Sequence, residues 1–295
     1  MNRYFRAIGF LDNFSREDYE RIVESITYRS ENLEEIEKNH PKYILMDKCL
    51  EYSKDIGICV RVIKDSKGNI YRESVFPYYK NTNMTKEDNC SFEKKISGEE
   101  FIGVYEDINL SENVYFFVQN ADEIYKIRNI KDTKCKIGIS GLSIAGNVIL
   151  PIKKNDTEIE DTRNFHKKRV NLLSKAYDGD QGAFAAVRHE DILTNVTVSE
   201  QIFVEAMDIY TIVDSSFIPC GAECDLYSVL GDIADYKRVE NSVTKEGIYL
   251  LDVLVKGVTI KICINEKDLF GEPQKGYRFK GTVWLQGFIN SDYDS

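Results

Sequence analysis

The sequence predicts an α+β protein with an N-terminal, mostly antiparallel sheet domain that includes a helix, a helical connector and a C-terminal small β-barrel domain. Two observations carry this prediction. Most segments in both halves of the chain alternate apolar and polar residues, which is typical of half-buried strands. The tract between them repeats its apolar residues at helical spacing. We expect a sheet domain over residues 1–155, a connector over 156–206 and a β-rich, barrel-like domain over 207–295.

The N-terminal domain is expected to begin with a strand and a helix. Residues Arg3–Phe10 alternate well enough for a short strand. Ser15 is a candidate N-cap, because its hydroxyl can accept a hydrogen bond from a free amide in the first helical turn. Residues 57–79 predict a hairpin, since Asp65–Asn69 supplies turn residues between two β-rich runs.

The connector follows a charged stretch. Residues 153–163 contain few apolar side chains, which favours a domain boundary near Asp156. The clearest helix of the sequence comes next, with its apolar stripe formed by Phe165, Leu172, Leu173, Ala176 and Tyr177. Asp180 is then expected to cap a second helical run that extends from about Gln181 to Ala206.

The C-terminal domain shows the strongest strand pattern. Gly231–Asn241 predicts a first strand, and Lys256-Gly257 predicts a tight turn between the next two. Each later strand has one apolar face, formed by Val258, Ile260, Ile262 and Ile264 and then by Phe279, Val283, Leu285 and Ile289. This pattern favours a five-stranded, OB-like barrel. No internal repeat is visible in the chain.

The opposite face of the last strand carries aromatic side chains among cationic and amide ones. We expect this face to be a binding surface, formed by Arg278, Lys280, Trp284, Gln286 and Phe288. Such a set suits a domain or subunit interface, a stacking surface for single-stranded nucleic acid, or a groove for a small molecule. The chain contains 49 acidic and 39 basic residues, so its net charge of −10 disfavours nucleic acid and favours an interface or core packing.

No catalytic set is apparent. Gly138, Gly141 and Gly146 lie between strands without a Gly-Lys-Ser/Thr motif, so a hairpin turn at Ala145-Gly146-Asn147 is favoured over a phosphate loop. The three histidines are far apart, and no Ser lies in a G-x-S-x-G elbow. Adjacent carboxylates are numerous in so acidic a chain and select no acid/base pair. We therefore expect no cofactor and no catalytic residue.

The cysteines and the termini indicate a location. Seven scattered cysteines predict reduced thiols and not a disulfide frame. Cys220 and Cys224 lack a second pair, so a turn is favoured over a metal site, although the sequence leaves open whether they bind anything. No apolar segment is long enough for a membrane helix, and the N-terminus lacks the apolar core of a signal peptide. We expect a cytoplasmic protein.

Four motifs suggest a family. They are RYFRAIGF at Arg3–Phe10, GLSIAGNVILPI at Gly141–Ile152, GAECDLYSVLGDI at Gly221–Ile233, and INEKDLFGEPQKGYRFKGTVWLQG at Ile264–Gly287. With these motifs the chain resembles domain of unknown function 3881, a family of anaerobic, low-GC Gram-positive bacteria. The resemblance implies a full-length, cytoplasmic bacterial protein of unassigned activity, and it brings no catalytic residue.

Three functions are compatible with the sequence. The leading hypothesis is a non-enzymatic binding or assembly protein, which uses its C-terminal sheet and domain junction to hold a partner protein or a second copy of itself. The alternative is an enzyme or small-ligand-binding protein with a site at the junction, where pockets commonly form. The third is single-stranded nucleic-acid binding by the OB-like domain. A cleft with perturbed titratable groups would favour the second, and a flat apolar patch the first.

Overall fold

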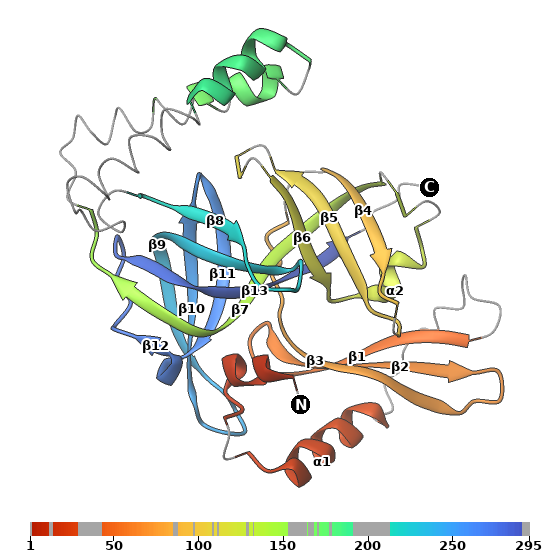
Figure 1. Ribbon diagram of the computed structural model, residues 1–295. Coiled ribbons are helices and arrows are strands. Elements are labelled where there is room, and N and C mark those ends of the chain that lie inside the picture. Colours follow the sequence, from red (N-terminus) through yellow and green to blue (C-terminus); the bar gives the residue numbers. More distant parts are fainter. Residues whose placement is uncertain are drawn as a thin grey trace.

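The protein is mostly sheet with few helices, so the predicted α+β class is confirmed at this level (Figure 1). The computed structural model describes residues 2–11, 14–28, 43–84, 88–96, 98–107, 109–110, 112–127, 130–131, 133–152, 164, 168–169, 171–176, 179–190 and 213–290. Two sheets are formed, one of three strands and one of ten. Within the described residues, no helix has the length and apolar character needed to cross a membrane.

The chain begins with a 3-10 helix, η1 (Arg3–Ile8), where a strand was predicted. The Asn2 side chain accepts a hydrogen bond from the Tyr4 amide, and Gly9 ends the helix with a φ of 93° that favours glycine. The strand prediction was wrong because the apolar residues follow a different period. Tyr4, Phe5, Ala7 and Ile8 are all buried, which is helical spacing rather than alternation.

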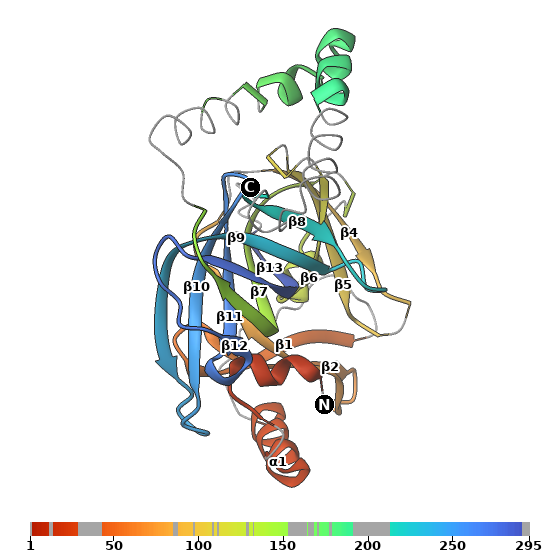
Figure 2. The ribbon, with the colours of Figure 1, turned by 60° about the vertical axis from the view of Figure 1, so that its left-hand side comes forward.

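The helix α1 (Arg16–Thr27) is capped as predicted. The Ser15 hydroxyl oxygen lies 3.0 Å from the Asp18 amide nitrogen and accepts its hydrogen bond. Val23 and Ile26 pack inward from this helix. In Figures 1 and 2, α1 lies below the three-stranded sheet and η1 lies between α1 and the larger sheet.

The three-stranded sheet consists of β1 (Tyr43–Ser53), β2 (Ile56–Asp65) and β3 (Ile70–Tyr79) in antiparallel order. The predicted hairpin is confirmed as β2 and β3, and the Asp65 carboxylate accepts the Lys67 and Asn69 amides in its turn. Cys49 and Cys59 face each other across β1 and β2 and form a disulfide. The prediction of reduced thiols was wrong for this pair, because only strand register brings the two residues together.

The ten-stranded sheet is organised around two long antiparallel strands, β7 (Thr133–Ile149) and β13 (Arg278–Asn290). Its other strands are β4 (Asp88–Lys94), β5 (Phe101–Asp107), β6 (Glu112–Val118), β8 (Ser216–Pro219), β9 (Leu226–Glu240), β10 (Gly247–Val255), β11 (Val258–Asn265) and β12 (Leu269–Phe270). Two short helices, α2 (Ala121–Ile124) and η2 (Glu266–Asp268), precede β7 and β12. The strand predicted over Gly231–Asn241 is part of β9.

Strand pairing closes two rings that share β7 and β13. In the first ring, the antiparallel run β9–β10–β11 is joined to β7 through β11 and to β13 through β9. In the second ring, the run β4–β5–β6 is joined to β7 through β4 and to β13 through β6. The last strand of each run pairs in parallel with a long strand, β11 with β7 and β6 with β13. The first strand of each run pairs antiparallel with the other long strand, β9 with β13 and β4 with β7.

This arrangement makes the chain a topological repeat. Each half contains a run of three antiparallel strands, a short helix and then a long strand, and the roles of β7 and β13 exchange between the two rings. β7 precedes the predicted boundary at residue 155 and pairs with β11 and β13, which follow it. The repeat was not visible in the sequence because its two copies share strand order rather than residue pattern.

The predicted hairpin turn at Ala145-Gly146-Asn147 was wrong. β7 runs through these residues and stays paired with β13, with a register shift opposite Gly281 and Val283. Glycine is needed at position 146 for packing, because a Cβ atom there would lie 2.5 Å from the Phe279 ring. We predicted that this glycine reverses the chain, whereas its lack of a side chain leaves room for an aromatic ring within a continuous strand.

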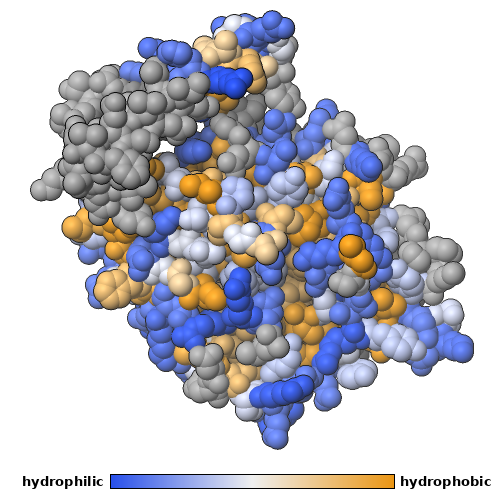
Figure 3. Space-filling view, in the orientation of Figure 1, coloured by the Kyte–Doolittle hydropathy of each residue, from blue (hydrophilic) through white to orange (hydrophobic). Residues whose placement is uncertain are grey.

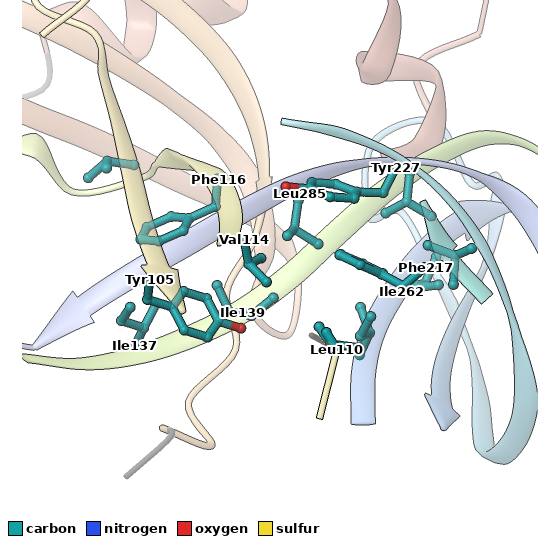
Figure 4. Close-up of a cluster of buried hydrophobic side chains, with 14 of the residues drawn as sticks. Tyr105, Leu110, Val114, Phe116, Ile137, Ile139, Phe217, Tyr227, Ile262 and Leu285 are labelled. Carbon is teal, nitrogen blue, oxygen red and sulfur yellow. The ribbon is translucent and has the colours of Figure 1, made fainter. Parts of the chain in front are cut away.

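The strand faces predicted in the C-terminal half are confirmed. The residues of the predicted apolar faces, apart from the half-buried Val258, belong to one buried cluster inside the rings, which Figure 4 shows in part. Its members from these two strands are Ile260, Ile262, Ile264, Phe279, Val283, Leu285 and Ile289. Lys256 and Gly257, both with positive φ, form the predicted turn between β10 and β11.

Most of the predicted connector, residues 156–206, lies outside the described residues. Residues 171–176 and 181–190 are helical, in agreement with the prediction for those segments. Asp180 caps the second of them as predicted, since its Oδ1 atom accepts the amides of Gly182 and Ala183.

The two sheets are joined by a buried arginine. Arg61 on β2 has no solvent exposure, and its guanidinium donates to both carboxylate oxygens of Asp47, at 2.6 and 3.0 Å. It also donates to the carbonyl oxygens of Glu99, Val118 and Gln119, which flank β5 and β6. The Asp47 carboxylate accepts the Ala121 amide at the start of α2. The Arg61–Asp47 pair itself lies within the three-stranded sheet, and its hydrogen bonds to the Glu99, Val118 and Gln119 carbonyls and to the Ala121 amide fasten that sheet to the second ring.

Replacing this arginine should strongly destabilise the protein. Arg61→Met leaves the Asp47 carboxylate buried without its cation, so we expect the free energy of unfolding to fall by about 3–5 kcal/mol in urea denaturation. Arg72→Met is the matched control, because Arg72 pairs with Glu20 at an exposed site and its loss should change little. Equal effects of the two substitutions would contradict the role assigned to Arg61.

Asp122 provides a pH-dependent test of the same region. Burial, and then the nearby Asp47 carboxylate, raise the pKa of Asp122 to about 6 from 3.8. The folded protein therefore binds this proton more tightly than the unfolded chain, and stability falls as pH rises from about 4 to about 6. We expect Asp122→Asn to stabilise the protein by about 2 kcal/mol at pH 7 and to have little effect at pH 4, as measured by urea denaturation. An equal effect at both pH values would contradict this assignment.

Candidate functional site

A cleft of about 490 Å³ opens where η1, β3 and the ten-stranded sheet meet. Its walls come from six separate parts of the chain and carry both aromatic and charged side chains. The lining residues are Asn2, Arg3, Tyr4, Val75, Phe76, Lys95, Glu100, Phe117, Glu223, Asp225 and Trp284. Figure 3 shows the surface of the molecule from one side, with hydrophilic side chains interspersed among smaller apolar areas.

Four buried aromatic rings form the floor of the cleft. The Trp284 ring centroid lies 5.0 Å from that of Tyr4 and 5.1 Å from that of Phe117, and Phe76 meets Phe117 edge-on at 4.8 Å. These rings come from η1, β3, β6 and β13, so both sheets contribute. Trp284 is the only tryptophan in the chain, and its emission therefore reports directly on this site.

Asp225 fixes the position of Trp284. Its Oδ2 atom accepts the indole N–H at 2.9 Å, and its carbonyl oxygen accepts the Leu285 amide at 2.8 Å. The segment before β9 is thereby held against β13. Asp225 is only 3% exposed, and burial raises the pKa of its carboxyl despite the hydrogen bond from Trp284.

Charges of both signs surround the floor. The Arg3 guanidinium lies 5.0 Å from the Tyr4 ring centroid and donates to the Tyr4 hydroxyl at 3.2 Å. Burial raises the pKa of that hydroxyl, and Arg3 partly offsets the effect. Across the cleft, the Lys95 ammonium lies 3.3 Å from a Glu100 carboxylate oxygen and 5.7 Å from the Phe117 ring centroid. The site can therefore meet anionic, cationic and flat apolar groups.

The five residues predicted as a binding surface on β13 do not form one exposed face, because the structure buries three of them. Trp284 points away from the ring interior as expected, yet η1 covers that face and leaves it 6% exposed. Gln286 is fully buried and donates to the Pro77 carbonyl at 2.9 Å. Arg278 is 4% exposed and donates to the Leu150 and Val213 carbonyls. The reason is that segments distant in the chain pack on this face, η1 against Trp284 and β3 against Gln286.

The other two predicted residues are partly buried. The Lys280 ammonium donates to the Ser228 hydroxyl at 2.6 Å, and burial lowers its pKa. The Phe288 ring lies 3.8 Å from the Lys80 ammonium. Of the five residues, Trp284 lies on the cleft and the others do not. A binding role for all five stays a prediction.

Sequence reasoning missed most of the cleft. Arg3, Tyr4, Lys95 and Asp225 are separated along the chain and share no motif, so nothing in the sequence placed them together. Because Arg3–Phe10 was predicted as a strand, the lining of the cleft by N-terminal residues was not expected. The signal that could have found it is the buried helical spacing of Tyr4, Phe5 and Ile8.

Cys220 and Cys224 flank the cleft in the turn before β9. The Cys220 amide donates to the Leu226 carbonyl at 2.9 Å, which closes the predicted turn. Cys220 is half-buried and Cys224 is exposed. Among the described residues, no group of three or more His, Cys, Asp or Glu side chains is placed to hold a metal ion.

The family comparison covers almost the whole chain. Residues 5–287 match the family described as "Domain of unknown function, E. rectale Gene description (DUF3881)". The chain belongs to this family. All of the cleft residues except Asn2, Arg3 and Tyr4 lie within the matched range. The family carries no assigned activity, so function rests on the site itself. Comparison with curated proteins gives no match, and comparison with solved structures gives none either.

The raised pKa of Asp225 predicts a titration of Trp284 fluorescence. Protonation weakens the carboxylate as a hydrogen-bond acceptor, so the indole emission should change with a midpoint above 3.8, the ordinary value for this carboxyl. The measurement is Trp emission against pH, over the range in which circular dichroism shows a folded protein. Asp225→Asn, which keeps an acceptor but does not titrate, should abolish the change. A transition that persists in this variant would contradict the assignment.

Proposed function

We propose that the protein is a non-enzymatic binding protein and that its ligand enters the cleft over Trp284. The observation that carries the proposal is the combination of an aromatic floor with a rim of both charges, at the junction of two sheets. The volume of about 490 Å³ falls in the usual range for ligand sites.

The proposed ligand is a small zwitterion with a flat or apolar part, such as an amino acid or the end of a peptide from a partner protein. Arg3 and Lys95 supply cations for its carboxylate, while Glu223 and Asp225 supply anions for its ammonium group. An aromatic floor favours a flat or apolar portion between them. Self-association through a chain terminus would use the same chemistry.

An enzyme with a site at the junction remains the second candidate, and one observation favours it. Asp225 is a buried carboxyl whose pKa is raised within the cleft, which is a property of many general acids and bases. However, the Oδ2 atom of Asp225 already accepts the Trp284 N–H. Its role in fixing the segment before β9 against β13 is enough to explain why Asp225 is buried. We therefore place binding first.

We also propose that the first ring is an OB-like barrel. In the proposed layout over residues 1–155, 156–206 and 207–295, four of its strands lie in the last part and β7 comes from the first. The support is its connectivity, in which three antiparallel strands lead to a parallel pairing and the ring closes with five members. β7, which pairs in parallel with β11, comes before the other four strands of this ring in the chain. Single-stranded nucleic acid is a weaker candidate ligand, because the chain has 49 acidic residues against 39 basic ones.

The proposal includes a cytoplasmic location. Its support is that five of the described cysteines lie outside the Cys49–Cys59 disulfide, and three of them, Cys90, Cys135 and Cys263, are buried. In a reducing compartment the Cys49–Cys59 pair would exist partly as thiols. Alkylation of a lysate under non-reducing conditions, followed by mass spectrometry, measures that fraction.

The test uses Trp284 as the reporter. We expect at least one member of a panel of amino acids and tryptophan-free dipeptides to change the emission of the purified protein and to raise its melting temperature. Arg3→Ala and Lys95→Ala should each weaken this binding about tenfold, equivalent to about 1.4 kcal/mol. Lys267→Ala is the matched control, because Lys267 pairs with Glu246 away from the cleft.

Two results would contradict the proposal. One is the absence of any response across the panel at millimolar concentration. The other is binding that leaves the Trp284 emission unchanged, which would place the ligand elsewhere. Turnover of a bound ligand that Asp225→Asn abolishes would instead support the enzyme.

A further inference from the structure

A second, apolar pocket lies between the two rings, on the opposite side of β13 from the cleft. It measures about 180 Å³. Ile139 and Leu285 of the shared strands lie along it, with Tyr105 and Val114 on the side of the second ring and Phe217 on the side of the first, as Figure 4 shows. This volume is large enough to hold more than one water molecule.

We propose that this pocket binds one small, largely apolar molecule with about the bulk of benzene. An apolar cavity of about 150 Å³ engineered into another protein stays dry and binds benzene, so the size is sufficient. The side chains of Val114, Ile139 and Leu285 are all buried there and present only hydrocarbon. Removing the apolar surface of such a molecule from water supplies the driving force.

The polar groups around the pocket favour an apolar ligand over a polar one. The side-chain Nδ2 atom of Asn81 donates to the Ile139 carbonyl at 2.7 Å, and its Oδ1 atom accepts the backbone amide of Asn83. The Asp107 Oδ1 atom accepts the amides of Asn109 and Leu110. Asn81 and Asp107 already bond to the chain through these atoms, so a polar ligand would gain few new hydrogen bonds from them and would lose those it makes with water.

The pocket is accessible from the surface. Asn83 and Thr259, which line it, are exposed, and Met84 is half-buried. The two rings are also held at a fixed separation beside it, because the Tyr227 hydroxyl accepts the Tyr115 amide at 2.7 Å and the Phe217 ring stacks on Tyr227 at 4.2 Å. A ligand would therefore enter a preformed site.

Toluene is the probe for the test. We expect saturation-transfer NMR to show binding to the full-length protein with a Kd of about 1 mM or below, and the melting temperature to rise with toluene concentration. Val114→Phe and Ile260→Phe place a ring in the pocket from opposite sides, and each should weaken binding at least about tenfold. Ile26→Val in α1 is the matched control, since it alters a core away from the pocket and should leave the toluene affinity unchanged.

A variant that enlarges the pocket covers the case in which the filling variants fail to fold. Leu285→Ala should bind p-xylene more tightly, relative to toluene, than the original protein does. Absence of toluene binding, equal binding to a folded filling variant, or an unchanged preference in Leu285→Ala would each overturn the proposal.

Discussion

The pairing of β7 with β13 is the constraint on which the rest of the structure depends. Both rings close through these two strands, so neither ring is complete without them. The crossing also demands small residues at close contacts. A Cβ atom at Gly287 would lie 2.2 Å from the Phe116 ring, and one at Gly141 would lie 2.1 Å from Val283. Glycine at these positions lets the two rings share a pair of strands while keeping their cores filled.

The alternation of side chains along β13 links the two proposed sites. Trp284 faces the cleft beneath η1, while its neighbour Leu285 faces the pocket between the rings. Successive residues of a strand point to opposite faces, so one segment serves both. The Asp225 carbonyl, which accepts the Leu285 amide, and the Asp225 carboxylate, which accepts the Trp284 indole, hold this segment in place.

The N-terminal segment and the three-stranded sheet convert an outer strand face into a cleft. Without them, Trp284 would lie on an open face of the ring. Arg61 contributes to the attachment, because its guanidinium, held by Asp47 on the neighbouring strand, donates three hydrogen bonds to the carbonyls of Glu99, Val118 and Gln119, beside β5 and at the end of β6. Burying the Arg61–Asp47 pair costs desolvation energy. In return, the hydrogen bonds of Arg61 fix the position of one sheet relative to the other. The aromatic floor depends on that relation.

The sequence by itself determined the α+β class, the hairpin over residues 57–79, the cap at Ser15 and the apolar faces of β11 and β13, because period and turn chemistry are local properties. Only the tertiary structure decided that β7 and β13 belong to both rings, that Gly146 admits a ring rather than reversing the chain, and that η1 covers Trp284. Alternation states which face of a strand is apolar. It does not predict which segment covers the opposite face, because that segment comes from a distant part of the chain and its position depends on long-range packing.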